Sequence, residues 1–355
     1  MPRSSDVVLL SGLSGFIAKH VARRLLEAGY AVRGTVRSRA KGEAARRALH
    51  EAGVDVSALE LVEADLTSDD GWDEAAAGCR YVQHTASPFP GTPPRDKYAL
   101  VPAARDGTRR VVEAAKRAGV ERLVLTSSVV AVYHGHEGDV GRRFTEADVS
   151  NVEAQTISSY AVSKTLAEEA AWDCVEQGPM ELAVVNPSLV FGPLLDAEAG
   201  TSLNLVAMMM KGMMPLVPNA RFGIVDVRDV AAAHLKAMTS PQAAGRRFIV
   251  TSEPMSLMEI GACLAQAYPS LRRLPRFTIP DAVVRAAGRV SRRARLLEAE
   301  LDPSRSLDNS AAREMLGIDF RSGEEAVVAA AESLVRFGLV RRPGLSRAQS
   351  RKARN

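Results

Sequence analysis

Tyr160 and Lys164 lie four positions apart, a spacing that places both side chains on one face of a helix. A tyrosine phenol has a pKa of about 10, so it donates a proton poorly at neutral pH unless a nearby cation stabilises the phenolate. Lys164 can supply that cation. Ser127 and Ser128 add hydroxyl groups at the end of an apolar run. Together these side chains predict proton transfer to or from a substrate oxygen.

A glycine-containing turn, SGLSGFIA over residues 11–18, stands between an apolar run and a helical pattern. In this spacing Gly12 permits a tight turn, Gly15 lets the backbone approach a pyrophosphate, and Ala18 lets the helix pack closely on a sheet. The helix N-terminus then favours the negative charge of the phosphates. The turn predicts a dinucleotide site, with an ordinary tight turn as the alternative.

The end of the second apolar run bears on which dinucleotide binds. An NAD site usually carries an acidic residue there, which binds the ribose 2′-hydroxyl. This chain instead has Arg37, Arg39 and Lys41, and no acidic residue before Glu43. Such cations suit a 2′-phosphate. We therefore expect NADPH or NADP in preference to NAD, the alternative being a solvated basic helix start.

The elements that must position these residues alternate along the chain. Short apolar runs predict strands over 7–10, 31–36, 59–64, 81–85, 123–127 and 182–186, and helical patterns predict helices over 17–27, 42–52, 107–118 and 160–176. Strands that are apolar on both faces and alternate with helices indicate a parallel sheet covered on both sides. The expected fold class is α/β, a Rossmann-type doubly wound parallel sheet.

We expect the Rossmann domain to occupy residues 1–190, with a late strand near 247–251 returning to it. Residues 191–340 are expected to form a smaller, mainly helical substrate-binding region. Residues 341–355 hold six basic and no acidic residues, and are expected to form a disordered basic tail. Met209, in a methionine-rich stretch, is predicted to contact substrate, with a helix core as the alternative.

Further motifs extend over nearly the whole chain: residues 35–37, 65–66, 107–108, 125–128, 160–172 (YAVSKTLAEEAAW), 186–193 (NPSLVFGP) and 225–230. With the glycine turn, they resemble the extended short-chain dehydrogenase/reductase family, and within it the dihydroflavonol 4-reductase-like carbonyl and aldehyde reductases. Flavonoid-reducing members carry a substrate-binding asparagine five positions beyond the catalytic serine. Tyr133 stands there, which argues against a flavonoid substrate.

The resemblance implies a role for each site residue. Tyr160 acts as general acid, Lys164 lowers the pKa of Tyr160 and holds the nicotinamide ribose, and Ser128 hydrogen-bonds the carbonyl. Ser128 is preferred to Ser127 because family members place the catalytic serine last in this pair. The expected cofactor-binding residues are Gly12, Ser14, Gly15, Phe16, Ile17, Arg37, Lys41, Asp65, Leu66, Thr85, Ala86, Ser87, Tyr160, Lys164, Pro187, Val190 and Ser202. The expected substrate-binding residues are Ser128, Tyr133, Tyr160 and Met209.

The expected function is NADPH-dependent reduction of an aldehyde or ketone to an alcohol by an oxidoreductase that acts on the CH–OH group of donors. One alternative is a nucleotide-sugar epimerase or dehydratase on the same scaffold. Dehydratases of this type need an acidic residue beside the catalytic serine, where Val129 and Val130 stand here. Another is a redox-sensing binding module, although such proteins tend to lose the Tyr–Lys pair.

Composition limits the other classes. With 355 residues, 46% of them hydrophobic, the chain can bury a core, which excludes a disordered protein. The net charge of +4 comes from two arginine-rich segments, 272–295 and 341–355, and the remainder is acidic, so we expect no nucleic-acid partner. We also expect no membrane partner, because no apolar run is long enough to span a bilayer.

Three separated cysteines, Cys79, Cys174 and Cys263, fit neither a disulfide framework nor a metal cluster. His134 and His136 lack a third converging ligand, so we expect no metal. The protein is expected in the cytoplasm, as a monomer or homodimer.

Overall fold

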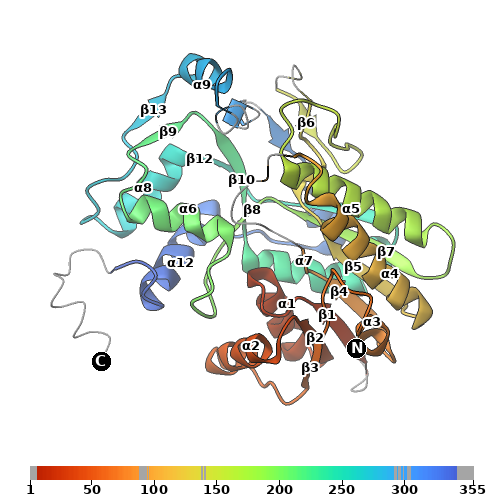
Figure 1. Cartoon of the computed structure of the whole chain (residues 1–355). Helices are drawn as coiled ribbons and strands as arrows, with labels where there is room; N and C mark the ends of the chain where they lie inside the picture. Colours follow the sequence, from red (N-terminus) through yellow and green to blue (C-terminus); the bar gives the residue numbers. More distant parts are fainter. Residues whose placement is uncertain are drawn as a thin grey trace.

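The computed structural model describes residues 6–87, 94, 96–136, 139, 141–291, 294, 297–298, 300–301 and 305–341. In this part of the chain, seven parallel strands form a central sheet (Figure 1): β1 Val7–Ser11, β2 Ala31–Val36, β3 Leu59–Glu63, β4 Tyr81–His84, β5 Arg122–Thr126, β7 Glu181–Pro187 and β11 Arg246–Val250. Their order is β11-β7-β5-β4-β1-β2-β3. The late strand β11 completes one edge, as expected.

Helices cover both faces of this sheet (Figure 1). On one face lie α1 Phe16–Glu27, α2 Arg39–Glu51 and α7 Val227–Thr239; on the other lie α3 Trp72–Ala76, α4 Gly107–Arg117 and α5 Ser159–Val175. Strand β1 shows why helices are needed on both faces. Val8 and Leu10 pack into the hydrophobic core under α1, α2 and α7, whereas Leu9 packs into the core under α3, α4 and α5. All three side chains are fully buried. The predicted Rossmann-type doubly wound sheet is confirmed.

Some element boundaries differ from the sequence prediction. Helix α2 begins at Arg39 rather than at residue 42, because extended Ser38 is its N-cap residue. Helix α4 follows directly on a π-helical segment, Pro102–Asp106, that the sequence pattern did not predict. Its first residue, Gly107, lies so close to Leu66 that a Cβ there would be 2.8 Å from the Leu66 Cβ. The glycine therefore lets α4 approach the loop after β3.

The C-terminal part has its own hydrophobic core, built on α6 Thr201–Met210, α8 Leu257–Ala267 and α12 Gly323–Arg336. A three-stranded sheet joins it: β8 Leu189–Phe191, β10 Arg221–Asp226 and β12 Pro254–Ser256. The other elements are β6 Arg143–Phe144, β9 Leu216–Pro218, β13 Phe277–Ile279, α9 Asp281–Gly288, β14 Ser306–Leu307 and α11 Ser310–Leu316. The helices were expected, but the sequence pattern did not predict these strands. All except the six-residue β10 have two or three residues, which is too short to show a period.

Two sequence predictions concern where the C-terminal part begins and ends. The first, the domain boundary at residue 190, stays a prediction. The proposed tail lies outside the described residues from position 342 onward. Over the residues that the structure describes, no helix has both the length and the apolar character needed to cross a membrane.

A partly buried ion pair joins the Rossmann sheet to the C-terminal part. Lys19 of α1 is 1% exposed and its Nζ pairs with Asp196, which follows β8. A buried ammonium without a counter-charge is unfavourable, so the pair constrains how the C-terminal part docks on α1.

Lys19→Ala should lower the free energy of unfolding by about 2 kcal/mol, because partly buried Asp196 would lose its cation. Chemical denaturation measures the change. The control is Arg23→Ala, which removes an exposed pair with Glu27 on the same helix and should cost about 0.5 kcal/mol or less. If both variants lost the same free energy of unfolding, the Lys19–Asp196 pair would contribute no more than an exposed ion pair.

Candidate active site

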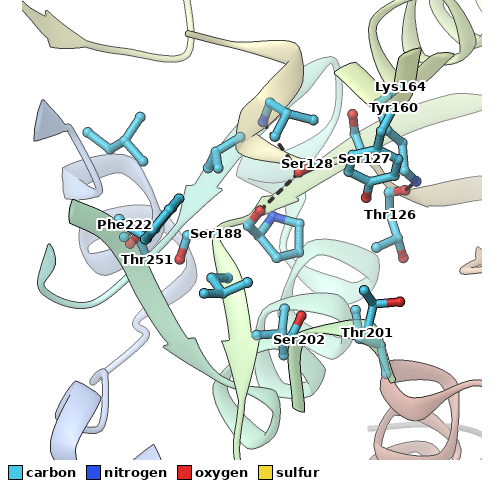
Figure 2. A pocket seen from close by; sticks show the side chains of 18 of the residues that line it. Thr126, Ser127, Ser128, Tyr160, Lys164, Ser188, Thr201, Ser202, Phe222 and Thr251 are labelled. Carbon is cyan, nitrogen blue, oxygen red and sulfur yellow. Dashed lines mark hydrogen bonds between the residues drawn. The ribbon is translucent and has the colours of Figure 1, made fainter. Parts of the chain in front are cut away.

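A cavity of about 570 Å³ lies between the carboxyl ends of the central strands and the C-terminal part. Figure 2 shows Tyr160, Lys164, Thr126 and Ser127 on one side of it, and Phe222, Thr251 and Ser188 on the other. Many predicted site residues from distant parts of the chain line it: Gly15, Phe16, Ile17, Thr85, Ser87, Ser128, Tyr133, Tyr160, Lys164, Pro187, Val190 and Ser202.

Tyr160 is the second residue of α5, and its place is set by the helix start. The Ser158 side chain caps the helix by accepting a hydrogen bond from the Ala161 amide at 3.1 Å. Removal from bulk water raises the Tyr160 pKa to about 12, and a hydrogen bond with the Ser128 side chain opposes that rise. The phenol is therefore protonated at neutral pH and is in contact with Ser128.

Lys164 lies one turn further along α5 and is 7% exposed. Its Nζ donates a hydrogen bond to the carbonyl oxygen of Thr126 at 2.9 Å. Burial lowers the Lys164 pKa to about 8, although the carboxylate of Glu168 acts in the opposite direction. The side chain is thus mainly an ammonium ion at neutral pH and begins to lose its charge under mildly alkaline conditions.

The structure distinguishes the two adjacent serines. Ser128 caps a short 3-10 helix by accepting from the Val130 amide at 3.3 Å, and its Oγ lies 3.5 Å from the Pro187 carbonyl oxygen (Figure 2). Ser127 instead donates to the carboxylate of Glu168. The Ser128 side chain also shares a hydrogen bond with the Tyr160 side chain. This geometry agrees with the choice of Ser128.

The glycine turn has the shape that a dinucleotide requires. Gly12 has φ +71°, and a Cβ there would lie 2.9 Å from the Ala86 Cβ. The Ser11 hydroxyl accepts from the amides of Thr85 and Ala86, both at 3.0 Å, which ties the turn to the end of β4. Gly15 is the N-cap residue of α1 and has no side chain that could occupy the first amides of the helix. The first turn of α1 also holds no acidic residue that would repel a phosphate. These features fit a pyrophosphate at the helix N-terminus.

Several predicted cofactor residues lie at the same sheet edge, beyond the cavity-lining set. Arg37 and Lys41 are exposed after β2, and Asp65 follows the neighbouring strand β3. Hydrogen bonds from Thr67 chiefly hold the Asp65 pKa below its usual range, and the charge of Arg37 adds to this effect. Leu66 packs against Gly107. Gly12, Ser14 and Ala86 form or contact the turn and are not among the cavity-lining residues.

Met209 is a correction to the expected substrate set. Its side chain is fully buried in the core of the C-terminal part, and it is absent from the cavity lining. On the same helix, Ser202 and Leu205 face the cavity. Ser202, Leu205 and Met209 lie on the same side of α6, at spacings of three and four residues. Position along the helix makes the difference, because Met209 lies in the last turn, where the C-terminal core covers it.

Tyr133 lines the cavity as expected, in a cluster that the sequence did not indicate. Its hydroxyl donates to Glu300 at 3.3 Å, while Arg305 pairs with Glu300 at 3.0 Å and lies 4.2 Å from the centre of the Tyr133 ring. His134 also faces Glu300. In the described residues, no group of three or more His, Cys, Asp or Glu side chains could hold a metal ion.

Sequence reasoning also missed a buried network beneath the site. Glu168 contacts Ser127, Asn186 and Arg247, which come from three different strand regions. One signal was available: Tyr160, Lys164 and Glu168 follow one another at intervals of four, so they share a face of the predicted helix.

A doubly wound sheet with a dinucleotide turn and a serine, tyrosine and lysine at one cavity defines a Rossmann-fold oxidoreductase. The sequence model of the NAD dependent epimerase/dehydratase family matches residues 8–250, and the chain belongs to that family. The expected extended short-chain dehydrogenase/reductase membership is thereby confirmed.

The chain is similar to characterised reductases. It is 37% identical to cinnamoyl-CoA reductase CAD2 of Medicago truncatula over 276 residues, covering 75% of this chain and 82% of the relative. It is 30% identical to the NADPH-dependent methylglyoxal reductase GRE2 of Saccharomyces cerevisiae, covering 93% and 98%. The crystal structure of yeast Gre2 complexed with NADPH superposes with a TM-score of 0.78 at 29% identity, covering 94% of this chain and 99% of that one.

Gly12→Ala should weaken NADPH binding at least about tenfold, because the new methyl group meets Ala86 and the turn loses its positive-φ residue. Fluorescence titration measures the affinity. Gly29→Ala is the control, since Gly29 also has positive φ (+86°) but has no atom within 4 Å of its Cβ position. An unchanged affinity in Gly12→Ala would remove the turn from the cofactor site.

Proposed function

We propose that the chain reduces aldehydes or ketones to alcohols with NADPH, using Ser128, Tyr160 and Lys164. One observation carries the proposal. The hydroxyl of Ser128, the phenol of Tyr160 and the ammonium of Lys164 come together in a cavity that also contains the N-terminal turn of α1. A carbonyl compound and a dinucleotide could therefore meet in one enclosed space.

When bound, NADPH supplies the hydride that reduces the carbonyl carbon. Ser128 donates a hydrogen bond to the carbonyl oxygen and orients it towards Tyr160. Tyr160 then gives its phenolic proton to that oxygen, which completes the alcohol. Lys164 stabilises the phenolate that remains, because its ammonium group lies on the same face of α5. Solvent returns the proton to Tyr160 after the alcohol leaves.

Residues at the sheet edge favour NADPH as the cofactor, as the sequence predicted. Arg37 is exposed at the end of β2, where the adenine ribose lies in Rossmann sites, and Lys41 follows in the first turn of α2. Both are free to contact a 2′-phosphate. The named use of NADPH by GRE2 supports the same cofactor.

The cavity wall indicates a hydrophobic substrate of small to medium size. Leu189, Leu205, Phe222 and Leu307 line the same cavity as Ser128 and Tyr160. An apolar wall with a few polar groups is typical of sites for small organic molecules. The relatives named for methylglyoxal and cinnamoyl-CoA reduction support α-keto aldehydes and aromatic carbonyl compounds as test substrates.

The name of the family includes epimerases and dehydratases, so we compare the reductase with that alternative. Val129 and Val130 line the cavity beside Ser128, where a dehydratase of this type needs an acid. Net consumption of NADPH with carbonyl substrates supports the reductase. Tightly retained oxidised cofactor without net consumption would favour the alternative. The cytoplasmic location and the monomer or homodimer state stay predictions.

Tyr160→Phe should lower kcat for NADPH-dependent reduction by at least about a hundredfold, because the proton donor is removed while the ring is kept. The assay follows NADPH absorbance with methylglyoxal and aromatic aldehydes. Tyr98→Phe is the control, since Tyr98 is 38% exposed and is absent from the cavity lining. If Tyr160→Phe kept full turnover, the proposed mechanism would fail.

Arg37→Gln should raise KM for NADPH about tenfold and leave KM for NADH nearly unchanged, because only NADPH carries the 2′-phosphate. The control is Arg47→Gln, an exposed arginine further along α2. Steady-state kinetics with both cofactors measure the ratio. Equal effects on NADPH and NADH would show that Arg37 does not read the phosphate.

A further inference from the structure

A buried carboxylate lies under the candidate active site. Glu168 follows Lys164 by one turn of α5 and Tyr160 by two, and its side chain is 5% exposed. A carboxylate removed from water is unfavourable unless charged or hydrogen-bonding partners surround it. The partners of Glu168 belong to the strands that carry the site.

One carboxylate oxygen of Glu168 organises the backbone at Ser128. Its Oε2 accepts hydrogen bonds from the Ser127 hydroxyl at 2.5 Å and from Asn186 Nδ2 at 3.0 Å. The same Asn186 nitrogen donates to the carbonyl oxygen of Ser128 at 3.1 Å, and Asn186 is fully buried. Glu168 thus holds residues on both sides of the Ser128 peptide unit.

The other oxygen faces Arg247 of β11. Glu168 Oε1 and Arg247 Nε form an ion pair at 2.5 Å. The N–H of that nitrogen does not point at the oxygen, so the contact is not also a hydrogen bond. The Arg247 guanidinium donates to the carbonyl oxygens of Glu146 and Asp148, at 3.1 and 2.8 Å. The pair therefore also anchors the segment that follows the Ser128 loop.

Charged and titratable groups lie around Lys164 on three elements, and a fourth contacts its partner Thr126. Tyr160 and Glu168 share its helix, His84 comes from β4, and Arg247 from β11 lies beyond Glu168. Burial lowers the pKa of His84 to about 3, so this imidazole is neutral. His234 of α7, which reaches the Thr126 hydroxyl at 3.0 Å, is neutral for the same reason. In the described part of the chain, Glu168 is the acidic group that acts on Lys164.

We propose that Glu168 is a positioning residue for carbonyl reduction: its carboxylate fixes the Ser128 backbone through Ser127 and Asn186, and places a negative charge one helical turn from Lys164. This inference rests on the proposed function. The geometry assigns Glu168 two separable effects, one on the placement of Ser128 and one on the charge of Lys164.

The test compares Glu168→Gln with Glu169→Gln, a matched change at the exposed neighbour on the same helix. Turnover and NADPH affinity are measured from about pH 6 to about pH 10. In the wild type both should fall as pH rises through about 8, where Lys164 loses its proton. In Glu168→Gln the fall should begin about one pH unit lower, because the ammonium form has lost a stabilising charge. Its kcat at neutral pH should drop about tenfold, about twofold from the smaller ammonium fraction of Lys164 and the rest from the displaced Ser128.

Glu168→Asp separates the two effects. It keeps the negative charge but shortens the side chain, so its pH profile should match the wild type while kcat stays low. Thermal unfolding identifies any variant that fails to fold. If Glu168→Gln fails, Glu168→Asp alone decides, because a wild-type kcat in that variant would contradict the positioning role.

The outcomes also separate this inference from the proposed function. A wild-type protein that turns over no carbonyl substrate would contradict the proposed function, while the pH dependence of NADPH affinity would still test Glu168. Superimposable pH profiles for Glu168→Gln and Glu169→Gln would overturn the inference. So would a Glu168→Asp profile shifted as far as that of Glu168→Gln.

Discussion

Lys164 is 7% exposed, and a cation so far removed from bulk water is stable only when protein groups replace its hydration. The Thr126 carbonyl oxygen at 2.9 Å and the carboxylate of Glu168 do this from β5 and from the next turn of α5. Glu168 in turn is balanced by Arg247. The charge at the surface of the cavity is therefore followed by further charges below it, from helix α5 to strand β11.

The parallel sheet makes this arrangement possible. Its strands end at one edge, so Ser11, Thr85, Ser128 and Pro187 lie near one another although they are far apart in sequence. Helices on both faces bury the sheet and hold the strand register. The sheet and its helices supply the stability, so the turns at the strand ends can adopt conformations suited to ligands. Gly12, with φ +71° and close to Ala86, is one example.

The side of the cavity opposite the strand ends is formed by the C-terminal part. Residues of β8, α6 and β10 face the strand ends and bring an apolar surface towards Ser128 and Tyr160. Helix α6 serves both the cavity and the C-terminal core, since Leu205 faces the former and Met209 the latter. In the proposed function this wall would contact the substrate, and the sequence indicates its composition but not its orientation.

The sequence alone determined the features that depend on local pattern. The strand-turn-helix at residues 7–27, the Tyr160–Lys164 spacing and the alternation of strands and helices are short-range, and the predicted span of β2 agrees with the structure residue for residue. Only the tertiary structure decided which side chains meet across the fold. The contacts of Glu168 with Arg247 and of Tyr133 with Glu300 join residues 79 and 167 positions apart, and no local period encodes such pairs. The burial of Met209 was likewise decided by the tertiary structure, because the core covers the last turn of α6, whereas Ser202 and Leu205 on the same side of the helix line the cavity.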